Sequence, residues 1–173
     1  KGISRNFGGL KAVDDVAFIL NNGDVAALIG PNGAGKTTCF NLLSGALSVN
    51  ASTVLFGGHD ITRWQPHQRA RAGIGRTFQI AATFRSMTAI ENVEAALMAA
   101  GMNTDTAEKL LEDVGMSAMT AAPVTTLAYG DVKRVELAMA LASEPALLLL
   151  DEPTAGMAAE ERHRIMQRIS DLV

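Results

Sequence analysis

The sequence is poor in cysteine, in aromatic residues and in long apolar runs. Cys39 is the one cysteine among 173 residues, which excludes a disulfide framework and is typical of a reducing compartment. We expect it to be a small core residue rather than a reactive thiol. The apolar runs, such as residues 146–150, are far shorter than the roughly 20 residues that a membrane-spanning helix needs. The net charge of −3 gives no electrostatic reason to expect nucleic acid as a partner.

Apolar residues make up 48% of the chain, enough for one ordinary domain with a real core. Apolar periodicity and turn residues predict strands at residues 13–20, 25–29, 53–56, 74–78 and 146–150. Helices are predicted at residues 39–43, 63–73, 90–98, 107–114, 132–142 and 159–172. The side chains expected to face the core in the first strand and the last helix are Val13, Val16, Phe18, Leu20, Ile165, Met166, Ile169 and Leu172.

Residues 30–38, Gly-Pro-Asn-Gly-Ala-Gly-Lys-Thr-Thr, match the phosphate-binding pattern G-x-x-x-x-G-K-[ST] at every position. The glycines let successive backbone N–H groups point inward around an anion, and the helix that follows adds its N-terminal dipole. Lys36 can bridge the β- and γ-phosphates, Thr37 can ligate Mg²⁺, and Thr38 can donate near the α-phosphate. A glycine-rich turn with an unrelated lysine is the alternative, which the predicted flanking strand and helix disfavour.

Two acids, Asp151 and Glu152, directly follow the apolar run at residues 146–150. Parallel strands present functional groups at their carboxyl ends, so this position is typical of the partner of a phosphate loop. Asp151 would hold Mg²⁺, directly or through water, and Glu152 could polarise an attacking water. Alone, an apolar run followed by acids is a weak signal, and the complete phosphate loop upstream makes it a strong one.

With these residues the chain resembles the ATP-binding subunit of an ABC transporter, most closely the branched-chain amino acid subgroup. Five segments in the family's order carry the resemblance: residues 5–13, 30–38, 75–79, 127–131 and 147–156. The resemblance implies an α/β fold with a P-loop NTPase core, mainly a parallel sheet flanked by helices, plus an N-terminal antiparallel β part. Residues 1–79 and 131–173 would form this core, and residues 80–130 a helical subdomain that ends in the signature loop.

The resemblance also assigns roles to individual residues. Phe7 would stack on adenine with Val13 nearby, so the nucleotide-binding residues are Phe7, Val13, Asn32, Gly33, Ala34, Gly35, Lys36, Thr37 and Thr38. The catalytic residues would be Glu152, Gln79 and Lys36, and the metal-binding residues Thr37, Gln79 and Asp151. The signature loop, which contacts ATP held by a second copy, would be Leu127, Ala128, Tyr129, Gly130 and Asp131. Residues 155–157 fall in the loop that crosses the dimer interface.

The chain departs from the family pattern in two places. The usual signature is Leu-Ser-Gly-Gly-Gln, so Ala128, Tyr129 and Asp131 are changes and the serine hydroxyl is absent. The family's switch histidine lies beyond the helix that follows Glu152, and His163 comes too early to match it. We therefore expect the chain to be a piece of a longer protein that binds ATP but turns it over weakly alone.

The cofactors implied are ATP and Mg²⁺, and the function is ATP hydrolysis that powers import of branched-chain amino acids or a similar solute. The implied partners are a second copy or a paralogous ATPase subunit, arranged head to tail, and transmembrane permease subunits. The implied location is the cytoplasmic face of the inner membrane. A GTPase is disfavoured because no lysine follows an asparagine, and a P-loop kinase would lack residues 127–131. A soluble ABC ATPase and a non-hydrolysing nucleotide-binding regulatory module remain alternatives.

Overall fold

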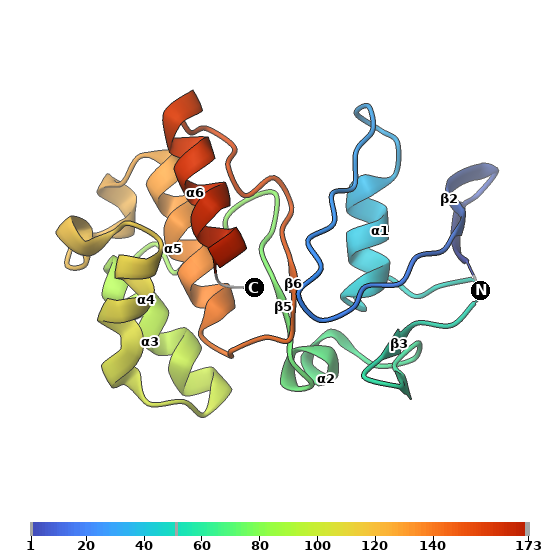
Figure 1. Cartoon of the computed structure of the whole chain (residues 1–173), viewed down its shortest axis with the longest axis horizontal. Helices are drawn as coiled ribbons and strands as arrows, with labels where there is room; N and C mark the ends of the chain where they lie inside the picture. Colours follow the sequence, from blue (N-terminus) through green and yellow to red (C-terminus); the bar gives the residue numbers. More distant parts are fainter. Residues whose placement is uncertain (1, 51, 172–173) are drawn as a thin grey trace. The chain divides into compact units, whose positions relative to one another are not determined.

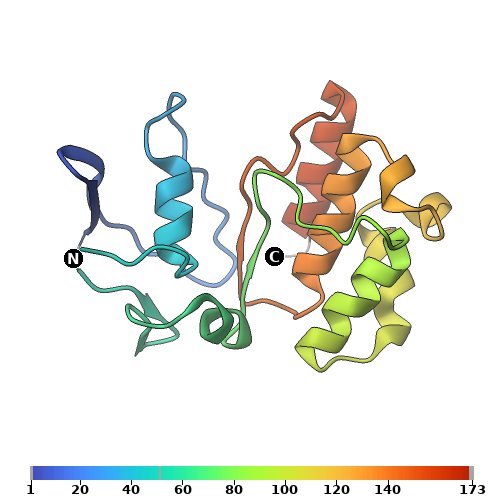
Figure 2. The same ribbon diagram turned by 180° about the vertical axis from the view of Figure 1, so that it is seen from behind.

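The computed structural model describes residues 2–50 and 52–171. The chain folds into two compact units, of which the first ends at Ile74 and the second begins at Gly75. Figure 1 and, from behind, Figure 2 trace both. This division differs from the sequence-based domain boundaries at residues 79, 80, 130 and 131, which stay a prediction. Among the described residues, no helix is both long and apolar enough to cross a bilayer.

The first unit combines two small antiparallel hairpins with two helices. The N-terminal hairpin pairs Ile3 with Val16 and Phe7 with Leu10, with register irregularities between. It turns at Gly8, whose φ of 59° suits glycine. The predicted antiparallel N-terminal β part is therefore present. The elements of this unit are β1 (Ile3–Phe7), β2 (Leu10–Val16), α1 (Lys36–Leu43), β3 (Leu55–Phe56), β4 (His59–Asp60) and α2 (Pro66–Arg71).

A buried arginine joins α2 to the end of α1. Arg69 is 1% exposed. Its Nη1 donates to the carbonyls of Leu42 at 2.8 Å and Leu43 at 2.6 Å, which are among the last carbonyls of α1. Its other nitrogens donate to the carbonyls of Thr62 and Trp64. Helix ends leave carbonyls without partners inside the helix, and here a guanidinium with five donors supplies them. Burial lowers the pKa of Arg69 below its ordinary value.

The second unit packs helices around one apolar core beside a two-stranded parallel sheet. Its elements are β5 (Ile74–Arg76, whose first residue is the last of the first unit), α3 (Ala89–Ala100), η1 (Thr104–Thr106), α4 (Ala107–Asp113), η2 (Ser117–Met119), η3 (Val124–Thr126), α5 (Tyr129–Leu141), β6 (Leu147–Leu149) and α6 (Ala159–Asp171). Helix α3 begins with a capping box between Thr88 and Glu91 and ends at Gly101, whose φ is 74°. These caps are the signals that favour helix start and stop at those positions.

The core of the second unit lies between α3, α4, α5 and α6, the helices that Figure 2 shows on its right side. Helix α5 contacts both α3 and α4, and Ile165 and Ile169 of α6 are buried, as predicted. The buried apolar side chains that form this core are Ala89, Val93, Leu97, Ala107, Leu111, Val114, Met116, Val135, Leu137, Ala138, Ala142, Met157, Ile165 and Ile169. One contiguous cluster of this kind is what holds a helical unit together.

Several sequence predictions are wrong in detail. Residues 25–29 form no strand, and Ile29 is 90% exposed. A strand needs a neighbour for its backbone N–H and C=O groups, and among the described residues none pairs with this segment. The strand predicted at residues 13–20 ends at Val16, leaving Phe18 and Leu20 exposed. Met166 is 43% exposed rather than inward, and Leu172 lies outside the described residues.

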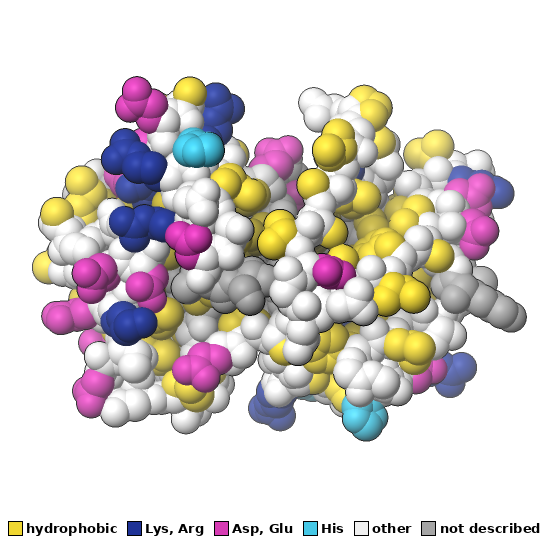
Figure 3. Space-filling view, viewed as in Figure 1, with side chains coloured by type: hydrophobic (Ala, Val, Ile, Leu, Met, Phe, Trp, Pro, Cys, Tyr) yellow, Lys and Arg dark blue, Asp and Glu magenta, His cyan; other side chains and the backbone are white. Residues whose placement is uncertain are grey.

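Figure 3 shows apolar side chains gathered on the visible face of the first unit.

Replacing Arg69 tests its part in the fold. Arg69→Met should lower the free energy of unfolding by about 3 kcal/mol or more, because each hydrogen bond to a charged group contributes about 1.5–3 kcal/mol. The exposed Arg71 on the same helix is the matched control, and Arg71→Met should change stability by about 1 kcal/mol or less. Urea unfolding followed by circular dichroism measures both. Equal losses would contradict the role assigned to Arg69.

Candidate nucleotide-binding residues

The phosphate loop ends where α1 begins. Gly35 is the N-cap of α1 with φ 84°, Lys36 is the first helical residue, and no acidic residue lies in the first turn. The loop closes on itself through a bond from the Ala34 N–H to the Pro31 carbonyl at 3.2 Å. Gly33 also has a positive φ, 81°. The helix therefore offers unpaired N-terminal N–H groups and a positive dipole end, without a carboxylate to compete for them.

Gly35 is fixed by contact as well as by conformation. A Cβ atom at Gly35 would lie 2.0 Å from the carbonyl oxygen of Ala12 in β2, closer than any real contact. At Gly33 an added Cβ would meet nothing within 4 Å. The motif glycines thus serve different purposes. Gly35 lets strand β2 pack against the start of α1, whereas Gly33 only needs its backbone angle.

Lys36 is folded onto the loop that precedes it. Its Nζ donates to the carbonyls of Gly30 at 2.7 Å and Pro31 at 2.9 Å. An ammonium has three N–H donors, so a phosphate oxygen can accept the third. The hydroxyl residues that follow differ in burial, because Thr37 is exposed and Thr38 is half-buried. Asn32 and the neighbouring loop residues are exposed, so the loop is accessible to a ligand.

Phe7 lies at the tip of the N-terminal hairpin, where its side chain is 45% exposed. The guanidinium of Arg5 lies 5.1 Å from the centre of its ring, a cation–π distance. The ring is accessible to stack on another flat group. Val13, the other predicted adenine contact, is buried in the first unit at 5% exposure.

In the second unit, β6 leads directly to the two predicted acids. Asp151 is buried at 6% exposure, and its backbone N–H donates to Thr77 Oγ1 at 3.2 Å. Its Oδ2 is buried and has no hydrogen-bond partner among the described residues. The nearby guanidinium of Arg76 has a pKa lowered by burial, an effect that the charges of Asp151 and Glu136 oppose. A buried carboxylate oxygen without a donor is costly unless a cation or ligand satisfies it.

Glu152 is exposed and has φ 50°, a left-handed conformation that is uncommon for glutamate. Its carbonyl accepts the N–H of Ala155 at 3.1 Å, which closes the turn after β6. The chain therefore reverses direction at Glu152, so that Asp151 is buried while the next carboxylate faces solvent. Strained backbone of this kind clusters at functional sites, where the surrounding structure holds it.

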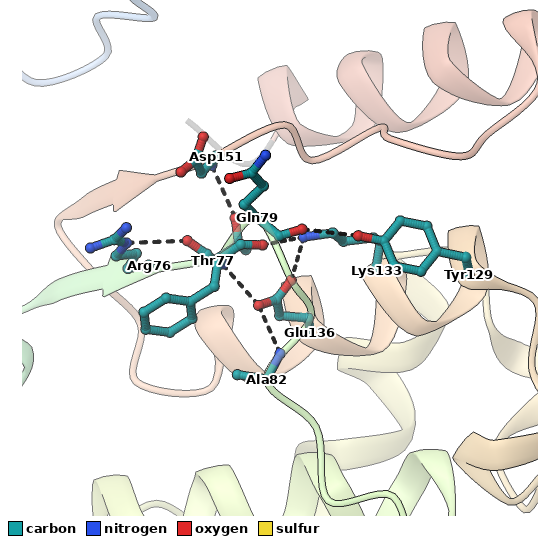
Figure 4. A network of polar contacts seen from close by, with 9 residues as sticks. Arg76, Thr77, Gln79, Ala82, Tyr129, Lys133, Glu136 and Asp151 are labelled. Carbon is teal, nitrogen blue, oxygen red and sulfur yellow. Dashed lines mark hydrogen bonds and ion pairs between the residues drawn. The ribbon is translucent and has the colours of Figure 1, made fainter. Parts of the chain in front are cut away.

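Gln79 and the predicted signature loop meet in the second unit (Figure 4). Tyr129 Oη donates to the Gln79 carbonyl at 2.9 Å. The predicted interface loop also contacts the signature residues, because a Cβ at Gly156 would lie 2.7 Å from the Tyr129 ring and one at Gly130 would lie 3.1 Å from Met157. The remaining signature residues precede α5 or lie in its first turn: Leu127, Ala128 and Asp131.

Sequence reasoning missed three residues that organise this region. Thr77, Lys133 and Glu136 are buried polar side chains that hydrogen-bond to the segments carrying Asp151 and Gln79. Thr77 lies within residues 75–79, a segment that the sequence analysis recognised as a family motif, so its place in that motif could have marked it as a functional candidate. Lys133 and Glu136 have the spacing of an ordinary exposed helix pair, so the sequence offered no signal for them.

Residues 13–155 match the protein family described as ABC transporter. The chain belongs to this family. One similar solved structure is MJ1267 in its ADP conformation, an ATP-binding cassette of an ABC transporter. Its TM-score is 0.88 and its sequence identity 32%, and the match covers 99% of this chain and 74% of the MJ1267 chain. For cbiO1 from Clostridium perfringens, part of the transporter complex cbiONQ, the TM-score is 0.85 and the identity 28%, and the match covers 99% of this chain and 71% of the cbiO1 chain. These cassettes confirm the predicted fold class.

The curated relatives of this ABC transporter chain have different transport roles. This chain is 36% identical over 190 residues to LivG of Escherichia coli K12, a branched-chain amino acid transport ATP-binding protein. It is 34% identical over 179 residues to LptB of the same organism, the ATP-binding protein of a lipopolysaccharide export system. Each match covers 99% of this chain and 74% of the relative. An uncharacterized ABC transporter ATP-binding protein of Rhizobium meliloti is 35% identical over 161 residues, with 91% of this chain and 60% of the relative covered. The chain thus spans less than two thirds of that relative.

Two glycine variants test the packing of the phosphate loop. Both Gly33→Ala and Gly35→Ala force an L-residue into left-handed backbone, at a cost of about 1–2 kcal/mol. Gly35→Ala should lower the free energy of unfolding further, because its Cβ meets the Ala12 carbonyl. Urea unfolding of both variants beside the wild type measures the difference. Equal losses would show that β2 does not pack against the start of α1.

Proposed function

We propose that this chain is the ATP-binding and ATP-hydrolysing part of an ABC transporter, and that the energy of hydrolysis powers transport of a small solute. The observation that carries the proposal is a complete phosphate loop at the N-terminus of α1 in a chain of this family. Backbone N–H groups, a helix dipole and one lysine are the groups that bind a triphosphate. Membership of the family supports ATP as the nucleotide.

In this proposal the phosphates bind to Lys36 and to the backbone N–H groups of residues 32–38. Lys36 is already directed at the loop through its bonds to two loop carbonyls, so little ordering of its side chain is needed when phosphate binds. The accessible ring of Phe7 stacks on adenine, and Val13, a buried residue of β2 in the same hairpin, packs nearby. Stacking reads a flat surface rather than base edges, so this contact alone would select weakly among bases.

We propose that Mg²⁺ binds together with the nucleotide. The buried Oδ2 of Asp151 lacks a partner among the described residues. No three His, Cys, Asp or Glu side chains of those residues could hold a metal by themselves. A single carboxylate, with the Thr37 hydroxyl and the Gln79 amide as further ligands, is typical of Mg²⁺ that arrives with a nucleotide, since phosphate oxygens and water complete its shell. When bound, Mg²⁺ would neutralise charge on the phosphates.

Glu152 is the proposed general base. It is exposed, so it can reach a water, and its left-handed backbone turns it away from the buried Asp151. A positioned carboxylate that takes a proton from attacking water typically accelerates a reaction by about 10²–10⁴-fold. Gln79 is proposed to orient the same water.

The proposed partners are a second ATPase copy, which would receive the signature residues 127–131, and transmembrane permease subunits at the cytoplasmic face of the inner membrane. The relative cbiO1 is part of a transporter complex, which supports such an assembly. We propose branched-chain amino acid import because LivG is among the relatives. The similar identity to LptB makes lipopolysaccharide export the competing assignment.

Lys36→Ala tests nucleotide binding in the full-length protein. The variant loses charge-assisted contacts worth about 1.5–3 kcal/mol each, so ATP·Mg²⁺ should bind at least about tenfold more weakly. Titration calorimetry measures both affinities. Lys109→Ala removes a lysine whose side chain is 76% exposed on α4 and serves as the control, with affinity unchanged. Equal ATP affinity in the Lys36 variant and the wild type would rule out the proposed site.

A further inference from the structure

One face of α5 binds the main chain of the segment that carries Gln79. Tyr129, Lys133 and Glu136 lie at positions i, i+4 and i+7 of the helix, which places them on the same side. All three reach residues 78–82, some 50 or more positions earlier in the sequence. Figure 4 shows the three side chains converging on this segment from α5. We refer to them as the α5 clamp.

The carboxylate of Glu136 holds the segment on both sides of Gln79. Its Oε1 accepts the backbone N–H of Phe78 at 2.8 Å and that of Ala82 at 3.2 Å. Glu136 is 3% exposed, so these bonds form in a low-dielectric environment where they are strong. Because the two N–H groups flank Gln79, one carboxylate fixes where the chain enters and leaves the turn at that residue.

Lys133 and Tyr129 fix the carbonyl groups of the same segment. Lys133 Nζ donates to the carbonyl of Phe78 and lies 3.1 Å from Glu136 Oε2, with its side chain fully buried. Tyr129 Oη donates to the carbonyl of Gln79 itself. The side chain of Gln79 stays out of this network and is directed to the side on which Asp151 lies (Figure 4).

A purely structural role is the competing explanation for these residues. A buried ion pair is costly to desolvate, and apolar residues of similar size often stabilise a fold as well or better. Here, however, every hydrogen bond that leaves the pair goes to the backbone within four positions of Gln79. An apolar pair could fill the space but could not set the path of that backbone.

We propose that Glu136 is a positioning residue that holds Gln79 in place for ATP hydrolysis, with Lys133 as the counter-ion of its buried carboxylate, and that the α5 clamp joins Gln79 to the signature residues at the start of α5. The inference rests on the proposed function. It makes the Gln79 segment and the signature loop parts of one body, because Tyr129 belongs to both the loop and the clamp. A shift of α5 caused by ATP on a partner copy would then move Gln79 directly.

Two double variants of the full-length protein separate positioning from packing. The Met/Met variant, Lys133→Met with Glu136→Met, removes the ion pair and the carboxylate that accepts the Phe78 and Ala82 N–H groups. The Met/Gln variant, Lys133→Met with Glu136→Gln, also removes the charges but keeps an amide oxygen where the carboxylate oxygen was. Both avoid leaving one buried charge unpaired, which would destabilise the fold by itself. Glu161→Gln, which removes one of the two carboxylate partners of Arg134, a residue of α5 outside the clamp, is the control for ion-pair loss.

The measurements are kcat for ATP hydrolysis, ATP affinity, thermal midpoint and hydrogen exchange of the backbone N–H groups in residues 77–83. In the Met/Met variant kcat should fall at least about tenfold, since small misplacements of positioned groups cost up to about 10²-fold. Its ATP affinity should be unchanged, and the N–H groups of Phe78 and Ala82 should exchange faster. The Met/Gln variant should retain most of the wild-type kcat and protection, and Glu161→Gln should retain both.

Each of the following outcomes would overturn the inference. If the Met/Met and Met/Gln variants have the same kcat, or if ATP affinity falls as much as kcat, the residues serve packing alone. If the N–H groups of Phe78 and Ala82 exchange equally in all variants, the clamp does not hold the segment. If the wild-type protein binds ATP without hydrolysing it, the proposed function fails and the positioning role fails with it. Normal hydrolysis in the wild type and the Met/Met variant would leave the proposed function intact and refute only this inference.

Discussion

Each compact unit buries charged side chains whose partners are mainly backbone groups, and the predicted functional segments depend on those bonds. In the first unit, Arg69 binds carbonyls at the end of α1, the helix whose other end carries the phosphate loop. In the second unit, Glu136 and Lys133 bind the backbone on either side of Gln79. A buried charge without a partner costs several kcal/mol, so neither cation nor anion can be lost without disturbing the segment it holds.

The predicted nucleotide-binding residues of the first unit and the predicted acids of the second unit lie in surroundings of different charge. The phosphate loop has Lys36 and a helix N-terminus with no nearby acid in the helix's first turn. The end of β6 has the opposite character, with a buried Asp151 oxygen that lacks a donor and an exposed Glu152 in strained backbone. Anionic phosphates suit the first set of groups, and a divalent cation or a proton suits the second. The predicted functional groups of the two units thus differ in charge.

The apolar pattern of the sequence predicted the helices well, and the helix expected at residues 90–98 lies within α3. The capping box at Thr88 and Glu91 and the glycine at position 101, which the prediction did not use, mark the ends of α3, because caps are set by neighbouring residues. The segment at residues 25–29 was mispredicted, because its apolar run has the composition of a buried strand but a strand also requires a distant partner. Motif spacing likewise identified residues 30–38 and the acids at the end of β6 without any knowledge of the fold.

The clamp on α5 could not be predicted in the same way. A lysine and a glutamate three positions apart are usually an exposed pair on a helix surface, and their burial depends on a segment more than 50 residues earlier in the chain. The same holds for the contact between Gly35 and the Ala12 carbonyl, which explains why that glycine is required. Sequence patterns predicted the groups that bind and react, whereas the buried side chains that hydrogen-bond to the same segments became visible only in three dimensions.

The most direct test of the central claim is phosphate release by the full-length protein with Glu152→Gln. If Glu152 is the general base of an ATPase, the variant should still bind ATP while hydrolysis falls by about 10²-fold or more. Glu144→Gln is a close control, because Glu144 is also an exposed glutamate in left-handed backbone, with φ 45°. The account predicts loss of hydrolysis at Glu152 alone. Wild-type turnover in the Glu152 variant, or an equal loss in both variants, would contradict it.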